Sequence, residues 1–273
     1  MYSYQHRYHA GGISDVHKHL VMIAILSALQ KKETPIGILD LHAGEGLYDI
    51  HAPESQKTTE FKHGFRKLIG VENPPPLVQT YLEVINKYNP STSKHMYPGS
   101  PGIAAHFLRE NDRLMCVEKH PQAITELKKH FKHWAQIHER DSFEAIKALT
   151  PFKEKRGLIL VDPSYEVKTE YKAIAKAVNE SFERFAQGTY AIWYPILKEN
   201  HHIQLLTGLQ RSSLTKVWYC EWSGFNDNPE SGLQGTGMVI INMPYQQDKL
   251  LKETFSWLDK HVYKGYVFKQ GWI

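Results

Sequence analysis

The sequence predicts a doubly wound α/β domain that ends in an antiparallel element. Apolar runs of strand length alternate with segments of helical periodicity between residues 36 and 194. Such alternation is typical of a parallel sheet that is covered by helices. Two later strand-like runs, 215–222 and 237–242, are joined by a polar, glycine-rich connection and can pair antiparallel. We therefore expect the 273 residues to form one domain, with a helical insertion at about 50–97.

The first half of the chain supplies a helix, a strand and the insertion. Ser14 is a good N-cap for a helix over 14–32, whose apolar residues recur at helical spacing. A strand over 36–41 follows and breaks at two glycines. The next 50 residues or so contain a polar stretch, three consecutive prolines and a helix over 77–88. These helical pieces without an obvious strand indicate an inserted subdomain.

The alternation resumes after the insertion. Ser100 as an N-cap with Pro101 at the first helical position predicts a helix over 100–109. Asp141 and Glu144 have the spacing of a capping box at another helix start. The other strands are expected at 114–117, 135–138, 158–161, 189–194 and 262–268, and the other helices at 121–134, 141–149, 171–185 and 247–260.

Composition and charge limit the class of protein. Hydrophobic residues make up 41% and charged residues 23% of the chain, as in ordinary globular domains. The formal charge of +4 slightly favours a partner that carries phosphate. Cys116 and Cys220 lie in apolar runs, and two cysteines exclude a disulfide framework. Neither a membrane-spanning stretch nor a signal peptide is evident, so we expect a cytoplasmic protein without a membrane partner.

One predicted strand ends in a turn that is suited to chemistry. The apolar run 158–161 is followed by Asp162, Pro163, Ser164 and Tyr165. Ligands of open α/β sheets bind beyond the carboxyl ends of the strands. A carboxylate, a carbonyl and a flat ring at this place can bind the exocyclic amine of an extruded base, with the ring stacked on it. The turn therefore predicts amino methylation of a nucleobase, although Tyr165 can instead be a packing ring over the strand end.

A cofactor site is predicted from residues that follow the other strands. Gly44 and Gly46 let backbone amides approach a ligand, or simply form a turn, and the third glycine of a dinucleotide fingerprint is missing. Glu118 ends the second strand, where an acid can accept ribose hydroxyls. Asp141 follows the third strand and can meet an adenine amine or cap a helix. With Asp162 after the fourth strand, this order predicts S-adenosylmethionine along the sheet edge.

Aromatic and basic residues are interleaved near the amino terminus. Such a mixture suits single-stranded RNA, because bases stack on rings and phosphates need cations. Buried hydrogen bonding is the alternative for the histidines of this cluster. The cluster consists of Tyr4, His6, Arg7, His9, Lys18 and His19. The sixteen histidines show no zinc signature, so we expect no metal.

Several segments in register carry a resemblance to a known family. They include Ser3-Tyr4-x-His6-x-x-His9-Ala10-Gly11, Asp15-Val16-x-Lys18-His19, Asp40-x-His42-Ala43-Gly44-x-Gly46, Tyr97-Pro98-Gly99-Ser100-Pro101, Arg156-Gly157-Leu158-Ile159-Leu160 and Gly188-Thr189-Tyr190-Ala191-x-Trp193-Tyr194-Pro195. Over essentially its whole length the chain resembles the bacterial large-subunit (23S) ribosomal RNA adenine-N6 methyltransferases of the RlmJ type. The resemblance implies a Rossmann-like class I methyltransferase sheet, a small helical insertion and a monomer. It also implies naked or partly assembled ribosomal RNA as the substrate.

The resemblance also implies roles for single residues. Asp162 is the implied catalytic residue, and Tyr4 the implied RNA contact. The chain departs from the family pattern Asp-Pro-Pro-Tyr at Ser164, which removes the restraint that a following proline places on Pro163. Ser142 stands where the family tends to have glycine. The residues implied to contact S-adenosylmethionine are His19, His42, Ser100, Glu118, Asp141, Ser142 and Asp162.

Other functions fit parts of this pattern. A DNA adenine-N6 methyltransferase shares the catalytic turn, but the insertion is small for a domain that reads base edges. A noncatalytic RNA-binding assembly factor that keeps a nucleoside pocket is a second alternative, which the departure at Ser164 favours. A nicotinamide-dependent dehydrogenase fits less well, because the third fingerprint glycine is missing.

Overall fold

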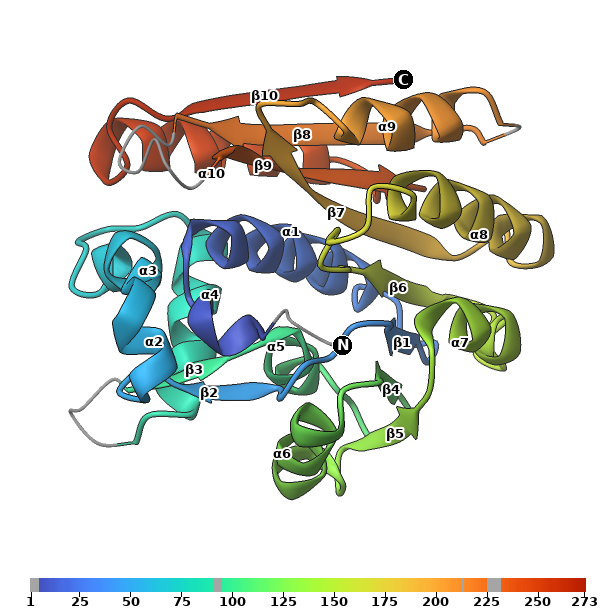
Figure 1. Cartoon of the computed structure of the whole chain (residues 1–273), viewed down its shortest axis with the longest axis horizontal. Helices are drawn as coiled ribbons and strands as arrows, with labels where there is room; N and C mark the ends of the chain where they lie inside the picture. Colours follow the sequence, from blue (N-terminus) through green and yellow to red (C-terminus); the bar gives the residue numbers. More distant parts are fainter. Residues whose placement is uncertain (1–4, 91–94, 213, 225–231) are drawn as a thin grey trace.

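A mixed sheet runs through the molecule in the order β10-β8-β9-β7-β6-β1-β4-β5 (Figure 1). The computed structural model describes residues 5–90, 95–212, 214–224 and 232–273. The strands from β5 to β7 are parallel, whereas β9, β8 and β10 are antiparallel to their neighbours. The predicted α/β fold with an antiparallel end is confirmed. The strands are β1 (Gly37–Asp40), β4 (Arg113–Glu118), β5 (Ala135–Glu139), β6 (Gly157–Val161), β7 (Thr189–Leu197), β8 (Val217–Ser223), β9 (Leu233–Ile241) and β10 (Val267–Trp272).

Helices cover both faces of the sheet, so its central strands are buried. Every residue of β1 and β6 is buried, which explains why both read as continuous apolar runs. The helices that pack on one face are α1 (Ile13–Leu29), α5 (Ser100–His106), α6 (Pro121–Phe131) and α10 (Gln247–His261). Those on the other face are α7 (Ser142–Leu149), α8 (Glu170–Arg184) and α9 (His202–Gln210). None of the described helices is long and apolar enough to span a bilayer.

The insertion between β1 and β4 contains two short strands that the sequence did not predict. They are β2 (Leu47–Asp49) and β3 (Met96–Pro98), which pair antiparallel and bring the two ends of the insertion together. The helical pieces lie on the same side of the molecule as α1, and α4 packs against α1 (Figure 1). They are α2 (Pro53–Thr58), α3 (Glu60–His63), η2 (Phe65–Leu68) and α4 (Pro76–Lys87).

Two predicted helix caps are wrong. The N-cap of α1 is Gly12, so Ser14 lies inside the first turn, and the N-cap of α5 is Gly99, whose backbone is extended. Ser100 and Pro101 are already helical, a position that suits proline because the first helical N–H groups have no partner within the helix. The third predicted cap is confirmed, since the Asp141 carboxylate accepts from the Phe143 N–H at 2.9 Å.

Two further differences concern the carboxyl-terminal third. Helix α9 was not predicted, although Leu205 and Leu209 are buried on one side of it. The last strand lies at β10 and not at 262–268. The reason is that the N–H groups of Val262 and Tyr263 both donate to the Leu258 carbonyl at the end of α10, so the chain is still turning there.

Candidate active site

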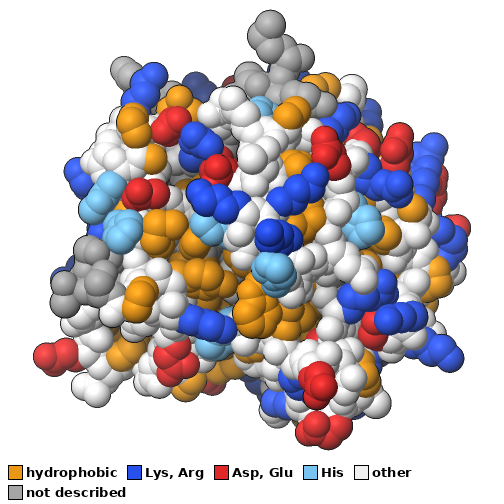
Figure 2. All heavy atoms as spheres, turned by 90° about the horizontal axis from the view of Figure 1, so that it is seen from below, with side chains coloured by type: hydrophobic (Ala, Val, Ile, Leu, Met, Phe, Trp, Pro, Cys, Tyr) orange, Lys and Arg blue, Asp and Glu red, His pale blue; other side chains and the backbone are white. Residues whose placement is uncertain are grey.

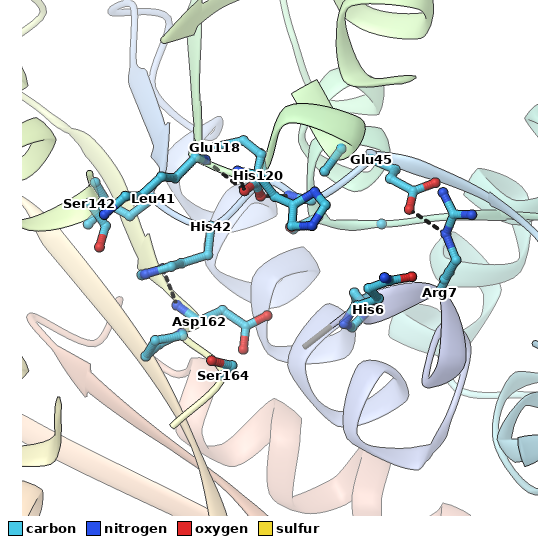
Figure 3. Close-up of a pocket in the computed structure, with 18 of the residues that line it drawn as sticks. His6, Arg7, Leu41, His42, Glu45, Glu118, His120, Ser142, Asp162 and Ser164 are labelled. Atoms are coloured by element: carbon cyan, nitrogen blue, oxygen red, sulfur yellow. Dashed lines mark hydrogen bonds and ion pairs between the residues drawn. The ribbon is translucent and has the colours of Figure 1, made fainter. Parts of the chain in front are cut away.

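A pocket of about 290 Å³ opens where the carboxyl ends of β1, β4, β5 and β6 meet. In this sheet the strands that follow β1 along the chain, β4 and β5, lie on one side of β1, and the next strand, β6, lies on its other side. Ligands of α/β folds bind at the point of the sheet where this change of side occurs. Figure 3 shows Glu118 and His120 on one side of the pocket, with Asp162 and Ser164 across from them. The predicted site residues that line it are His6, Lys18, His42, Gly44, Ser100, Glu118, Asp141, Ser142, Asp162 and Pro163.

Gly44 lines the pocket in a backbone conformation that favours glycine. Its φ is +58°, and a Cβ atom here would lie 2.2 Å from the Tyr48 hydroxyl oxygen. Tyr48 is buried and its hydroxyl accepts from the Glu45 N–H at 3.1 Å, so it cannot move aside freely. Gly46 differs: it packs on Phe131 and does not line the pocket, so the structure gives it a packing role.

Replacing Gly44 by alanine is expected to weaken S-adenosylmethionine binding by about tenfold or more, because the added methyl group must displace Tyr48. Gly70→Ala is the matched control: Gly70 also has a positive φ, +81°, but apart from its chain neighbours no atom of the described residues lies within 4 Å of its Cβ position. Isothermal titration of both variants with the cofactor checks this. Equal affinities of the two variants would contradict a role of the Gly44 turn in cofactor binding.

Glu118 binds the glycine loop and keeps acceptor capacity for a ligand. Its Oε2 accepts from the Gly44 N–H at 2.8 Å, and its Oε1 accepts from the N–H groups of Lys119 and His120, each at 2.7 Å. A carboxylate has about four acceptor positions. One position therefore remains for a hydroxyl donor in the pocket.

Asp141 combines its role as a helix cap with a place in the pocket wall. Besides the Phe143 N–H, its carboxylate binds the Lys119 ammonium at 3.2 Å. Burial acts to raise the pKa of Asp141, but Lys119 and the backbone donors outweigh it and lower the pKa overall. The carboxylate is thus charged and is fixed toward the pocket.

A buried network of charges leads from α1 to Asp162. The Lys18 ammonium donates to Asp15 Oδ1 at 2.9 Å and to Asp162 Oδ2, and the three side chains are 5%, 2% and 11% exposed. Asp15 Oδ2 also accepts from the Gly11 N–H at 2.9 Å and lies 3.0 Å from His6 Nε2. Burial opposes the charge on Lys18, but the two carboxylates raise its pKa. Burial likewise opposes the charge on Asp15, but His6 and Lys18 hold its pKa well below the usual range.

His42 holds the backbone of Asp162. Its Nδ1 accepts from the Asp162 N–H at 3.1 Å (Figure 3). Burial lowers the pKa of His42, which favours the neutral ring that can accept this hydrogen bond. Asp162 is thus held through its backbone by His42 and through its side chain by Lys18.

Comparison with known proteins decides the family. The family model described as ribosomal RNA large subunit methyltransferase D, RlmJ, matches residues 33–273. The chain belongs to the RlmJ family. Two curated proteins named ribosomal RNA large subunit methyltransferase J are similar to it: one from Haemophilus influenzae, 37% identical over 263 residues (95% of this chain and 94% of that protein), and one from Escherichia coli K12, 34% identical over 260 residues (94% and 93%). The expected resemblance to the RlmJ family is confirmed.

A solved structure supports the same relationship. A crystal structure of a protein from Legionella pneumophila covers 97% of this chain and 98% of its own length, with a TM-score of 0.89 and 33% sequence identity. The sheet, the insertion and the antiparallel end described above are therefore shared over nearly the whole chain.

The structure does not bring every residue implied by the RlmJ resemblance to the pocket. His19 is fully buried, its Nδ1 lies 2.8 Å from the Tyr97 hydroxyl, and it does not line the pocket. Burial lowers the pKa of His19 to about 3. Successive helical residues point about 100° apart, so Lys18 faces the pocket while His19 faces the insertion. His19 therefore lies behind Lys18 on the side of the insertion, and its implied contact with the cofactor stays a prediction.

Tyr165 is placed as a packing ring. It is buried, its ring stacks on Tyr171 with centroids 4.3 Å apart, and its hydroxyl donates to the Trp193 carbonyl at 2.6 Å. The ring does not line the pocket, so the expected stacking on an extruded base is not presented by this arrangement. Tyr165 instead has a φ of +52°, and its packing fixes the turn that carries Asp162.

The amino-terminal cluster divides into several environments. Tyr4 lies outside the described residues. His6 and Arg7 line the pocket, and the Arg7 guanidinium binds Glu45 at 2.8 Å and Glu54 at 3.0 Å. The expected role of Lys18 in RNA binding does not fit the structure, because its buried ammonium is held by two carboxylates.

Several polar residues of the pocket were not predicted. Arg140, directly after β5, and His120, two residues after Glu118, both line it. The sequence could have predicted both residues from their place after two predicted strands, since residues that follow neighbouring parallel strands meet at one edge of the sheet. Within the described residues, no group of three or more histidine, cysteine, aspartate or glutamate side chains is arranged to hold a metal ion.

Proposed function

We propose that this chain transfers the methyl group of S-adenosylmethionine to the N6 amine of an adenine in large-subunit (23S) ribosomal RNA. Membership of the RlmJ family and the names of the two curated relatives support the reaction class and the substrate. One observation carries the choice of an exocyclic amine. Asp162 lies at the pocket with one carboxylate oxygen fixed by Lys18, directly before the Pro163 carbonyl.

The pocket residues suit S-adenosylmethionine. The remaining acceptor position of Glu118 fits a ribose hydroxyl, and Asp141 and Ser142 lie where the adenine amine of the cofactor would find an acceptor and a hydroxyl. Gly44 leaves the space that a side chain would fill. When bound, the cofactor supplies a methyl group on a positively charged sulfur. The acids of the pocket favour that charge.

Asp162 and Pro163 act on the amine that receives the methyl group. The lone pair of adenine N6 is delocalised into the ring, so the nitrogen attacks poorly unless it is oriented and its developing positive charge is stabilised. Lys18 occupies Oδ2 of Asp162, which leaves Oδ1 to accept one amine hydrogen. The Pro163 carbonyl accepts the other. These two acceptors supply orientation and electrostatic stabilisation in a partly enclosed site.

The base must leave its stack to reach this pocket, and the surrounding RNA must be held meanwhile. Figure 2 shows the face seen from below in Figure 1, where lysine and arginine side chains lie around a central apolar area, with acidic side chains among them. The lysines and arginines of this face can bind the phosphates of a folded RNA. We therefore propose naked or partly assembled ribosomal RNA as the substrate.

Transfer of a tritiated methyl group tests this proposal. The purified chain is incubated with labelled S-adenosylmethionine and either deproteinised ribosomal RNA or duplex DNA. We expect label in the large-subunit RNA and none above background in DNA. Label in DNA alone, or cofactor binding without transfer to any nucleic acid, would overturn the proposed function.

A further inference from the structure

Ser164 is a polar residue of the catalytic turn that the proposed transfer step does not use. It lines the same pocket as Asp162 and lies beside it (Figure 3). Across residues 5–90, 95–212, 214–224 and 232–273, no hydrogen bond involves its hydroxyl or its backbone N–H. Two other residues of the turn do have partners: the Asp162 side chain binds Lys18, and the Tyr165 side chain binds the Trp193 carbonyl. Ser164 therefore has donors at the pocket with no partner in the described structure.

The turn holds the backbone of Ser164 in a fixed place. The backbone of Asp162 is bonded to His42, and Tyr165 is anchored by its stacked ring and its hydroxyl. Ser164 lies between these two anchored residues. A donor that is fixed before binding loses little entropy when a ligand arrives, so it can contribute to affinity and selectivity.

The chemistry of adenine identifies the acceptor that matches this donor. Beside its exocyclic amine, adenine presents ring nitrogens that are acceptors and carry no hydrogen. A carboxylate that receives the amine, with a hydroxyl donor next to it, complements this pair. We propose that the Ser164 hydroxyl donates a hydrogen bond to the ring nitrogen beside the methylated amine, which makes Ser164 a specificity-determining residue. This inference rests on the proposed function of the same site.

A pair of isosteric variants tests the hydroxyl alone. Ser164→Thr keeps a hydroxyl, whereas Ser164→Val has nearly the same shape without one. We measure kcat and KM for deproteinised ribosomal RNA, together with the dissociation constant of S-adenosylmethionine. The threonine variant is expected within about threefold of wild type, and the valine variant about 5- to 10-fold lower in kcat/KM for RNA, as expected for the loss of one hydrogen bond. Cofactor affinity should be the same in both.

The outcomes separate this inference from the proposed function. Equal kcat/KM values for the threonine and valine variants overturn the role of the hydroxyl, as does a parallel loss of cofactor affinity. If the branched side chains impair folding, Ser164→Ala replaces them and is expected to show the loss of the valine variant; wild-type activity in Ser164→Ala overturns the inference. If wild type itself transfers no methyl group to ribosomal RNA, the proposed function fails and the assignment of Ser164 fails with it.

Discussion

Replacing Lys18 by methionine is expected to lower the free energy of unfolding by about 3 kcal/mol and to remove most methyl transfer. The Lys18 side chain is 5% exposed, and its ammonium is the shared partner of Asp15 and Asp162. Removing one partner of a buried ion pair leaves an uncompensated charge, which typically costs about 3–5 kcal/mol. Activity falls as well, because the Asp162 carboxylate loses the group that orients it. Chemical denaturation and methyl transfer to ribosomal RNA measure the two effects.

Two further variants make this result interpretable. Lys176→Met removes an exposed lysine that lies 3.8 Å from Glu180, and it should leave stability and activity near wild type. Asp15→Asn combined with Lys18→Met removes one of the two stranded charges, so it should regain part of the stability but not the activity. Full activity in Lys18→Met would show that the network does not position Asp162.

The contribution of this network to stability has a defined pH range. The pKa of Asp15 is lowered in the folded state, so its contribution is present above the ordinary value of 3.8 and is lost as the pH falls further. The pKa of Lys18 is raised, so its contribution is present below the ordinary value of 10.5 and is lost as the pH rises. In wild type the contribution of the network should therefore be nearly constant between about pH 5 and 9, which chemical denaturation across this range measures.

Replacing Asp162 by asparagine is expected to lower kcat by about a thousandfold while the chain stays folded. The amide removes the negative charge that faces the amine, and preorganised groups of this kind are worth about 10²–10³ in rate. The new NH₂ group and the Lys18 ammonium are both hydrogen-bond donors. If they face each other they repel, which rotates the asparagine side chain. Single-turnover transfer with saturating cofactor isolates the chemical step from binding.

A matched control is Glu183→Gln, which makes the same change from acid to amide on the exposed side of α8. It should transfer methyl groups at the wild-type rate. The cofactor dissociation constant of Asp162→Asn should change far less than its rate. A rate within tenfold of wild type would remove Asp162 from the reaction.

The sequence predicted the parallel half of the fold well because buried strands and amphipathic helices have clear patterns. Every residue of β6 is buried, and the run reads as apolar throughout. The small strands β2 and β3 left no such pattern. They are three residues each, and they pair across the whole insertion, which is a tertiary contact. The shift of β10 has a similar origin, since α10 ends in a turn in which Tyr263 is buried.

Strand order predicted much of the candidate site, and helix geometry decided the rest. Glu118 ends a parallel strand, Asp141 and Asp162 each follow one, and the sheet brings all three to the pocket. Lys18 and His19 are neighbours in the sequence, and only the direction of α1 shows that one side chain faces the pocket and the other the insertion. The link from Lys18 to Asp162 spans 144 positions of the chain, so no local pattern could reveal it.

Nucleoside analysis of the labelled RNA tests most directly whether Asp162 directs methyl transfer to an adenine amine. Ribosomal RNA is labelled by wild type and by Asp162→Asn, digested to nucleosides and separated. We predict that wild type yields labelled N6-methyladenosine as the main product and that Asp162→Asn yields almost none. Label in a different nucleoside, or equal labelled N6-methyladenosine from both proteins, would contradict the proposed role of this pocket.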